Sequence, residues 1–173
     1  MKEILAGLAD YNLKANERLV EILKTAPDSA LTKDMGSYYK SVAGTLDHLF
    51  IAEVSWLKRF NGFFTYGSLA GSWLISTGMD EIQSRTKGNP RQLFALLHDA
   101  DSLMAAFVKE LDEGDLGTRV RFKTMKGEEM QRKYWNTVLH VLNHGTHHRG
   151  EISAMLDMQG IANDYSGFNQ YTT

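Results

Sequence analysis

The sequence predicts an all-α protein, a four-helix bundle, and three observations support this fold class. Four long segments repeat apolar residues every three or four positions, which is the spacing of one face of an α-helix. No long alternation of apolar and polar residues indicates a strand, although a small irregular hairpin is compatible with the stretch before the last helix. The 173 residues, 43% of them hydrophobic, are enough for one domain with a sizeable core. We therefore expect residues 1–173 to form a single bundle domain.

The composition excludes several classes of partner. Charged residues make up 23% of the chain and the formal net charge is -2, so there is no large basic field and we expect no nucleic-acid partner. No apolar run approaches the ~20 residues that cross a bilayer, so we expect no membrane partner. The N-terminus lacks the apolar core of a signal peptide, and the absence of cysteine is compatible with a reducing cytoplasm, which is the expected location. Any metal must then be held by imidazole and oxygen.

The first helix is predicted to end near Thr25, because Pro27 disfavours helical geometry in the residue before it. Turn-forming residues dominate the stretch 27–40, which we interpret as a connection. The apolar stripe of this helix comprises Ile4, Leu8, Tyr11, Ala15, Leu19 and Ile22, widened by Leu5 and Leu23.

The second helix is predicted to begin at Ser41, a suitable N-cap, and to run to about Phe60. Around His48 its surface carries Thr45, Ala52, Ser55 and Arg59, and the small members leave room for a ligand or a substrate. The alternative is a buried histidine that is hydrogen-bonded to a backbone carbonyl.

Residues 61–79 form an aromatic-rich stretch with four glycines and no charged residue, which we interpret as an irregular loop. Left exposed, its side chains would form an apolar patch larger than monomers usually tolerate. We expect it to pair two copies into a homodimer; the alternatives are a lid over a metal pocket and an ordinary loop packed on the bundle. The apolar members are Phe63, Phe64, Tyr66, Leu69, Trp73, Leu74 and Ile75.

The third helix is predicted to begin with Asn89 as N-cap and Pro90 as its first residue, and to stop at residues 112–114. His98 lies away from its apolar line, so we expect that side chain to be solvated and reject it as a ligand. The predicted core residues are Leu93, Phe94, Leu97, Ala100, Met104, Phe107, Val108 and Leu111.

The last helix is predicted from Tyr134 to about Gln159, with Gly160 as its stop. The segments 119–122 and 128–134 before it flank the turn at 124–127 and form the candidate hairpin. The polar tail after Gly160 packs over the end of the bundle or trails off. The core stripe of the helix comprises Val138, Val141, Ile152, Met155 and Leu156.

Four of the six histidines lie within residues 139–152. His144 and His148 are four residues apart and share one face of a helix, a spacing that lets one transition-metal ion reach both rings. His140 extends the row, and Glu151 projects within about 20° of His144, as an outer partner or an additional ligand. The zinc-protease motif is excluded because Gly145 stands where that motif needs glutamate. No G-x-S-x-G motif supports a serine hydrolase.

Two motifs together resemble the DinB family of DinB/YfiT-like metalloenzymes: NHGTHHRGEI, followed by GIANDYSG, and DHLFIAEVSWLKRF in the second helix. The resemblance covers nearly the whole chain. It implies a four-helix bundle that binds one divalent metal ion through His48, His144 and His148, with His140 and His147 as extra histidines beside the site. One departure is Glu151, where glutamine is common in the family.

Three histidines with open coordination positions are typical of a catalytic rather than a structural metal site. Similar family members include transferases that use low-molecular-weight thiols such as bacillithiol or mycothiol. We therefore expect a metal-dependent enzyme of thiol-transferase or hydrolase type, with a small-molecule substrate and zinc, nickel or iron as the metal. The alternatives are a non-catalytic stress- or damage-associated bundle with a structural or vestigial metal site, and a helical binding module that uses the aromatic loop.

Overall fold

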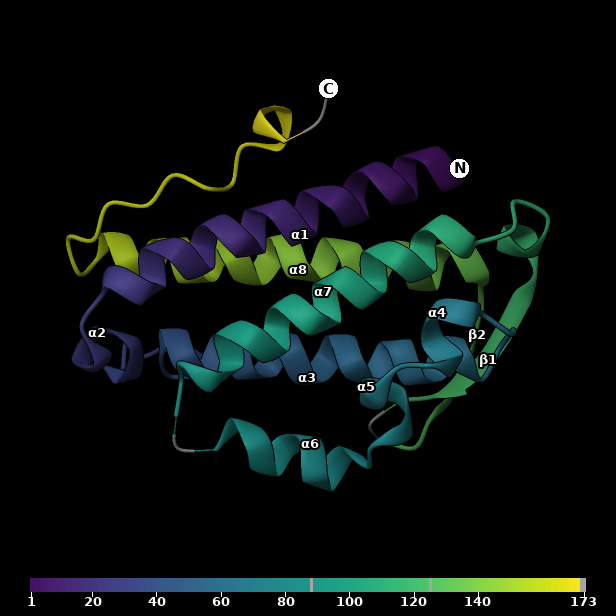
Figure 1. Cartoon of the computed structure of the whole chain (residues 1–173), viewed down its shortest axis with the longest axis horizontal. Helices are drawn as coiled ribbons and strands as arrows, with labels where there is room; N and C mark the ends of the chain where they lie inside the picture. Colours follow the sequence, from purple (N-terminus) through teal and green to yellow (C-terminus); the bar gives the residue numbers. More distant parts are fainter. Residues whose placement is uncertain (88, 125, 172–173) are drawn as a thin grey trace.

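The computed structural model describes residues 1–87, 89–124 and 126–171, so Gly88, Met125 and the last two residues of the expected domain lie outside the described ranges. The chain is predominantly helical with one two-stranded sheet, which confirms the predicted all-α class (Figure 1). Four long helices form the bundle: α1 (Lys2–Thr25), α3 (Val42–Asn61), α7 (Gln92–Glu110) and α8 (Tyr134–Asp157).

Each long helix packs against two others. α1 contacts α7 and α8, and α3 contacts the same two helices. α1 and α8 run in one direction along the bundle, whereas α3 and α7 run in the other (Figure 1). α3 and α8 are therefore antiparallel neighbours, which brings two histidine-bearing segments together from opposite parts of the sequence.

The connection from α3 to α7 is long because these neighbours are parallel, so the chain has to return along the bundle before α7 begins. Instead of the irregular loop expected for residues 61–79, this crossover contains α4 (Gly67–Ala70), α5 (Trp73–Ser76) and the start of α6 (Met79–Thr86). The connection 27–40 likewise contains a short helix, α2 (Asp28–Thr32). Sequence periodicity cannot detect helices of one turn.

The apolar residues of the 61–79 segment are covered by their own chain. Tyr66, Leu69 and Leu74 are buried, and the other four are half-buried against the bundle. The exposed patch that motivated pairing is thus largely absent, and the homodimer stays a prediction. Among the described ring contacts and hydrogen bonds, none joins this segment to His48, His144 or His148, so its packing gives no support to a lid.

α7 begins at Gln92, two residues later than predicted, and ends at Glu110. Asn89 still caps this turn, because its Oδ1 accepts a hydrogen bond from the backbone N–H of Arg91 at 3.0 Å. All eight predicted core residues of this helix are buried. His98 is 55% exposed and pairs with Glu17, as expected for a solvated side chain.

The predicted hairpin is present. The 3-10 turn η1 (Asp115–Gly117) leads into β1 (Arg119–Lys123), which pairs antiparallel with β2 (Glu129–Lys133). Phe122 lies opposite Met130 in the register, and Val120 opposite Arg132. The hairpin connects the end of α7 to the start of α8 at one end of the bundle (Figure 1).

α8 carries the predicted core stripe, all five members of which are buried. The helix ends at Asp157, and Gly160 adopts a φ of 71° that only glycine takes without strain. The tail, with its turn η2 (Phe168–Gln170), runs back along α1 instead of covering the bundle end or trailing off (Figure 1). Tyr11 Oη donates a hydrogen bond to the carbonyl of Ser166 at 2.8 Å, and Tyr165 Oη donates to that of Arg149 at 2.7 Å.

The buried face of α1 overlaps the predicted stripe but is not identical to it. The predicted residues that are buried are Leu5, Tyr11, Ala15, Leu19 and Leu23. Ile4 is 63% exposed, whereas Leu5, Asn12 and Asn16 are buried. Polar residues enter this stripe because the neighbouring helices supply hydrogen-bond partners, such as Asp101 for Asn16. A pattern based on apolar residues alone therefore misses the polar members of the buried face.

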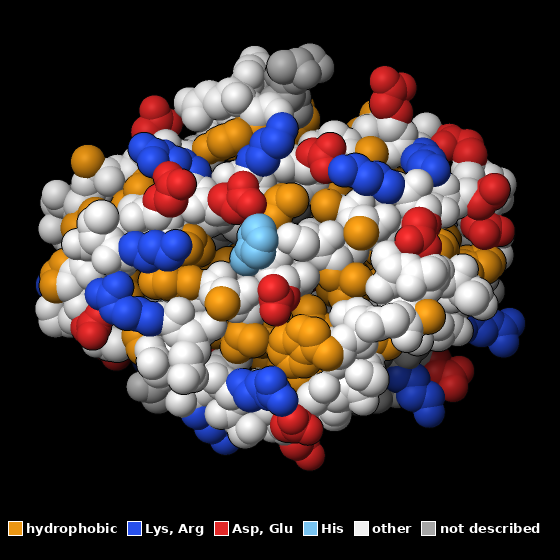
Figure 2. Space-filling view, in the orientation of Figure 1, with side chains coloured by type: hydrophobic (Ala, Val, Ile, Leu, Met, Phe, Trp, Pro, Cys, Tyr) orange, Lys and Arg blue, Asp and Glu red, His pale blue; other side chains and the backbone are white. Residues whose placement is uncertain are grey.

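No helix within the described ranges is long and apolar enough to cross a membrane. On the face that carries α1 and α7, Figure 2 shows acidic and basic side chains interspersed, without a block of one sign.

Candidate metal centre

α8 places two histidines one turn apart on the side that faces α3. His148 is 4% exposed and His144 is half-buried. Gly145 between them faces α1, where an added Cβ would lie only 3.3 Å from side-chain atoms of Asn12 and Arg149. The position that holds glutamate in zinc proteases is thus used here for close helix packing.

α3 places His48 opposite this pair. The helix begins at Val42, and the Ser41 hydroxyl accepts a hydrogen bond from the backbone N–H of Gly44 at 3.1 Å, as predicted for the cap. His48 lies almost two turns further along. Although 96 residues separate it from His144 in the chain, the two rings make a T-shaped contact with their centroids 5.1 Å apart.

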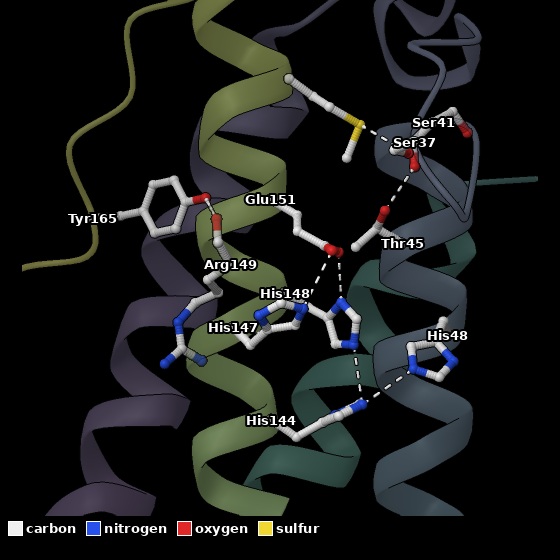
Figure 3. A network of polar contacts seen from close by, with 11 residues as sticks. Ser37, Ser41, Thr45, His48, His144, His147, His148, Arg149, Glu151 and Tyr165 are labelled. Atoms are coloured by element: carbon white, nitrogen blue, oxygen red, sulfur yellow. Dashed lines mark hydrogen bonds and ion pairs between the residues drawn. The ribbon is translucent and has the colours of Figure 1, made fainter.

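The three imidazoles converge through the same ring atom (Figure 3). His144 Nε2 lies 3.1 Å from His48 Nε2 and 3.0 Å from His148 Nε2. Within the described ranges, this group has three members, and their nitrogens all lie within 4.8 Å of one another. The structure therefore brings together the three residues that the family resemblance selected.

The separations fit a common metal ion. Two ligand nitrogens that each lie ~2.0–2.1 Å from one ion in tetrahedral geometry are about 3.3 Å apart. The separations of 3.0 and 3.1 Å between Nε2 atoms are close to that value. Imidazole is a ligand of zinc, nickel, copper and iron, so the donor set by itself selects no single metal.

The surroundings keep two of these rings neutral. Burial, reinforced by the neighbouring His148 and His48, lowers the pKa of His144 to about 3. Burial and the adjacent His148 also lower the pKa of His48, against the opposing pull of Glu151 and Asp47. A neutral imidazole has a free lone pair, so His144 and His48 are in the form that binds a cation.

Glu151 holds His148 from the other side of its ring (Figure 3). The Nδ1–H of His148 donates a hydrogen bond to Glu151 Oε2 at 2.7 Å, because the carboxylate can only accept. With the Nδ1 proton held by this bond, Nε2 is directed at the other two imidazoles. Of the two roles considered for Glu151, the geometry favours the outer partner that orients a ligand.

Tyr39 is a part of this centre that the sequence pattern missed. Its ring stacks on His48 with centroids 4.0 Å apart and an interplanar angle of 16°, and it contacts His148 edge-on. The loop that carries Tyr39 lies so close to α3 that a Cβ on Gly44 would be 2.1 Å from the Tyr39 carbonyl oxygen. A glycine in the first turn of a predicted helix was the signal that could have indicated this approach.

Arg149 fixes the opposite side of α8. Its side chain points away from the histidines toward α1 (Figure 3). There it donates hydrogen bonds to the side-chain oxygens of Asn12 and Asn16. Asn16 in turn donates to both carboxylate oxygens of Asp101 on α7. Consecutive residues of α8 thus serve different purposes: His148 faces the centre, and Arg149 ties the helix to the scaffold.

A buried pair of carboxyl groups, Glu53 of α3 and Asp101 of α7, joins this scaffold network. Burial raises the pKa of Glu53 to about 7, against the opposing effects of a hydrogen bond with Asp101 and of the Arg149 charge. Burial, followed by the charge of Glu53, raises the pKa of Asp101 well above its usual value. The pair therefore keeps a proton at a pH where exposed carboxyl groups have lost theirs.

The remaining histidines of α8 lie beside the centre. His140 contacts His144 with ring centroids 6.0 Å apart, and burial lowers its pKa. His147 is 63% exposed and lies 3.3 Å from Glu151 Oε1. Neither belongs to the group of His48, His144 and His148, but His147 forms a second group of possible ligands with His148 and Glu151.

Comparison with known proteins agrees with this architecture. The model of the DinB family matches residues 1–169. Protein DinB of Bacillus subtilis (strain 168) is 25% identical over 171 residues, which is 99% of this chain and 95% of that protein. No solved structure matches.

Proposed function

This chain belongs to the DinB family, and from that premise we propose that it is a metal-dependent enzyme of thiol-transferase or hydrolase type. His48, His144 and His148 would hold one divalent transition-metal ion, with zinc, nickel or iron as the candidates. The observation that carries the proposal is the convergence of three Nε2 atoms with separations of 3.0 and 3.1 Å at the centre.

The donor set favours catalysis over a structural role. Structural zinc sites usually have four protein ligands, whereas catalytic ones have three and leave a position open. The group of His48, His144 and His148 has three members. An ion bound there would act as a Lewis acid and lower the pKa of a thiol or a water molecule at the open position.

The residues of the chain would hold and orient the ligand rings. Glu151 keeps the proton of His148 on Nδ1, so that Nε2 stays free. Tyr39 stacks on His48 and limits its rotation. Burial keeps His144 unprotonated, since its pKa is lowered to about 3.

The composition is compatible with the thiol-transferase form of the proposal. The chain contains no cysteine, so a sulfur nucleophile has to come from a small-molecule thiol as cosubstrate. In such a transfer the thiol loses its proton, the sulfur forms a bond to an electrophilic carbon, and the leaving group departs with the bonding electrons. In the hydrolase form, water takes the place of the thiol.

The test begins with elemental analysis of protein purified without an affinity tag. About one zinc, nickel or iron per chain is expected. Metal-loaded and chelated protein are then compared in a thiol-conjugation screen and a hydrolysis screen, with His148→Ala as the inactive control. Metal binding without turnover in either screen would favour the non-catalytic bundle, and absence of metal binding would overturn the proposal.

We keep the homodimer as part of the proposal, because most soluble oligomers are symmetric dimers. Since Phe64 and Trp73 are half-buried in the crossover, the interface need not include them. Light scattering of the purified chain tests this point: the mass of a single chain, 19.5 kDa, would exclude the dimer.

A further inference from the structure

A cleft of about 520 Å³ lies between the β-hairpin and the groove formed by α3 and α8. Its walls include Trp56 and Arg59 from α3, Phe122 and Arg132 from the hairpin, and His140 from α8. Trp56 and Arg59 stand near the end of the motif DHLFIAEVSWLKRF, but the three-histidine group does not account for this cleft.

The cleft is basic. Arg59, Lys123 and Arg132 all line it, and no aspartate or glutamate does. Within the described ranges, none of these three cations takes part in an ion pair. Basic side chains without acidic partners, gathered in a concave site, favour a bound anion.

The same cleft has an aromatic wall. Trp56 and Phe122 meet edge to face with ring centroids 5.1 Å apart, and the Arg59 guanidinium lies 4.9 Å from the centroid of the Trp56 ring. The side-chain hydroxyl of Ser55 accepts a hydrogen bond from Arg59 at 3.0 Å, which holds the guanidinium in place. An apolar wall beside fixed cations suits an organic anion better than a small inorganic one.

The cleft adjoins the metal centre through one side chain. The His140 ring contacts Trp56 in the cleft at 5.5 Å and His144 in the centre at 6.0 Å, measured between ring centroids. A molecule that fills the cleft would therefore have one end beside His140, whose ring contacts His144 of the centre.

A second cavity on the bundle lacks these properties. The groove of about 690 Å³ between α1 and α7 is larger, but Glu17, Glu21 and Asp101 line it together with Lys24 and Arg91. It includes none of the three converging histidines. Judged by volume alone, this groove would be the better candidate for a ligand site. Charge and position favour the cleft at the hairpin instead.

We propose that the hairpin cleft binds the carboxylate of a small organic acid, with Arg59 and Arg132 as the anion-binding residues and Trp56 and Phe122 against its apolar part. The role of this acid as the substrate of the three-histidine centre rests on the proposed function. Binding of the acid itself does not, because the cleft is formed by side chains outside the metal ligands.

The test uses the full chain, both chelated and supplemented with zinc, and follows backbone amides by NMR. The probes are phenylacetate and phenylacetamide, which have nearly the same shape but differ in charge. Phenylacetate should shift the amides around Trp56, Phe122 and His140 in a saturable way in both samples. Phenylacetamide should bind at least about fivefold more weakly, as expected for the loss of one partly exposed charge interaction.

Matched variants locate the contact. Arg132→Gln should weaken phenylacetate binding about fivefold, whereas Lys133→Gln, the same charge change at the next residue of β2, should leave it unchanged. Arg59→Lys keeps the charge but loses the planar fork, and should weaken binding less than Arg59→Gln.

Two results would overturn the inference. One is equal affinity for the acid and the amide; the other is binding that occurs only with zinc and is unaffected by Arg132→Gln, since the carboxylate would then ligate the ion. Failure of the proposed function has a different signature: the protein would bind no metal, while phenylacetate binding to the chelated sample would persist.

Discussion

Glu151 Oε2 lies 2.7 Å from Nδ1 of His148, on the side of the imidazole opposite the nitrogen that faces His144. The two residues are three positions apart on α8, so a single turn of helix sets both the ligand and the group that orients it. A carboxylate on Nδ1 also raises the basicity of Nε2, which strengthens a bond to a cation.

Replacing Glu151 should therefore weaken metal binding without removing a ligand. Glu151→Ala is expected to lower zinc affinity about 10- to 100-fold, the usual effect of losing such an outer partner. Glu151→Gln keeps an acceptor but not the charge, so its affinity should fall between those of the wild type and Glu151→Ala. Competition with a zinc-binding dye measures these affinities, with the exposed Glu21→Gln as control. Complete loss of zinc in Glu151→Gln would instead indicate a directly coordinating carboxylate.

Replacing a converging histidine should remove the metal and leave the fold. His144→Ala or His48→Ala is expected to reduce the content from about one ion per chain to a small fraction, because two imidazoles remain. Elemental analysis measures the loss, and far-UV circular dichroism should stay helical, since the core stripes of α3 and α8 lie beside these side chains. His98→Ala, at the exposed histidine on α7, is the control that retains metal. A full metal content in His48→Ala would exclude this residue as a ligand.

Gly44→Ala should destabilise the protein. The added Cβ would lie 2.1 Å from the carbonyl oxygen of Tyr39, so the loop has to move away from α3. We expect a loss of roughly 1–3 kcal/mol in the free energy of unfolding, as for other overpacked positions, together with a change in the Tyr39–His48 stacking.

Denaturant titration measures the first effect of Gly44→Ala, and the histidine ring resonances in NMR report the second. Gly7→Ala is the matched control, because nothing lies within 4 Å of a Cβ at that helical position. It should stabilise α1 by about 0.5–1 kcal/mol. Equal changes in the free energy of unfolding for Gly44→Ala and Gly7→Ala would show that the Tyr39 loop does not pack closely against Gly44.

The buried Glu53–Asp101 pair should make stability depend on pH. The pKa of Glu53 is raised from 4.5 to about 7, so the folded protein keeps a proton that the unfolded chain has released. The protonated Glu53 side chain therefore contributes to the free energy of unfolding fully below about pH 4.5, and this contribution is lost as the pH rises through 7.

Glu53→Gln removes this pH-dependent loss of stability, because a glutamine side chain does not ionise. In chelated protein its free energy of unfolding should match that of the wild type near pH 4.5 and exceed it at pH 8 by on the order of 2–3 kcal/mol. Denaturant titrations across this range measure the difference, and His144 titrates alike in both proteins. The exposed Glu21→Gln should show no such trend, and a difference independent of pH would contradict the raised pKa of Glu53.

The parts of the fold that follow from periodicity were predictable from the sequence. The apolar parts of the buried faces of α7 and α8 match the predicted ones because these apolar residues recur every three or four positions, although Asp101, His148 and Arg149 are buried beside them. The predicted face of α1 was incomplete because Asn12 and Asn16 are buried against hydrogen-bond partners on other helices. The spacing of apolar residues reflects hydrophobicity, but it does not indicate which polar side chains will find hydrogen-bond partners.

The candidate centre was predictable only in part. The spacing of His144 and His148 fixes their common face, whereas the selection of His48 came from a family resemblance, since no local pattern links residues 96 apart. Tyr39 was missed because a loop carries it, and its place depends on how closely that loop approaches Gly44. The length of the crossover was likewise explained only when α3 and α7 proved to run parallel.

All three converging imidazoles come from α3 and α8, while α1 and α7 supply none. α3 and α8 therefore supply the candidate metal ligands, whereas α1 and α7 support them. Arg149 links α8 to α1 through its hydrogen bonds to Asn12 and Asn16. In evolutionary terms, exposed positions on α1 and α7, such as His98 and Glu17, can vary without moving a ligand nitrogen. The hairpin side of the cleft likewise lies outside the three ligands, so a side chain such as Phe122 or Arg132 can be replaced without removing an imidazole from the centre.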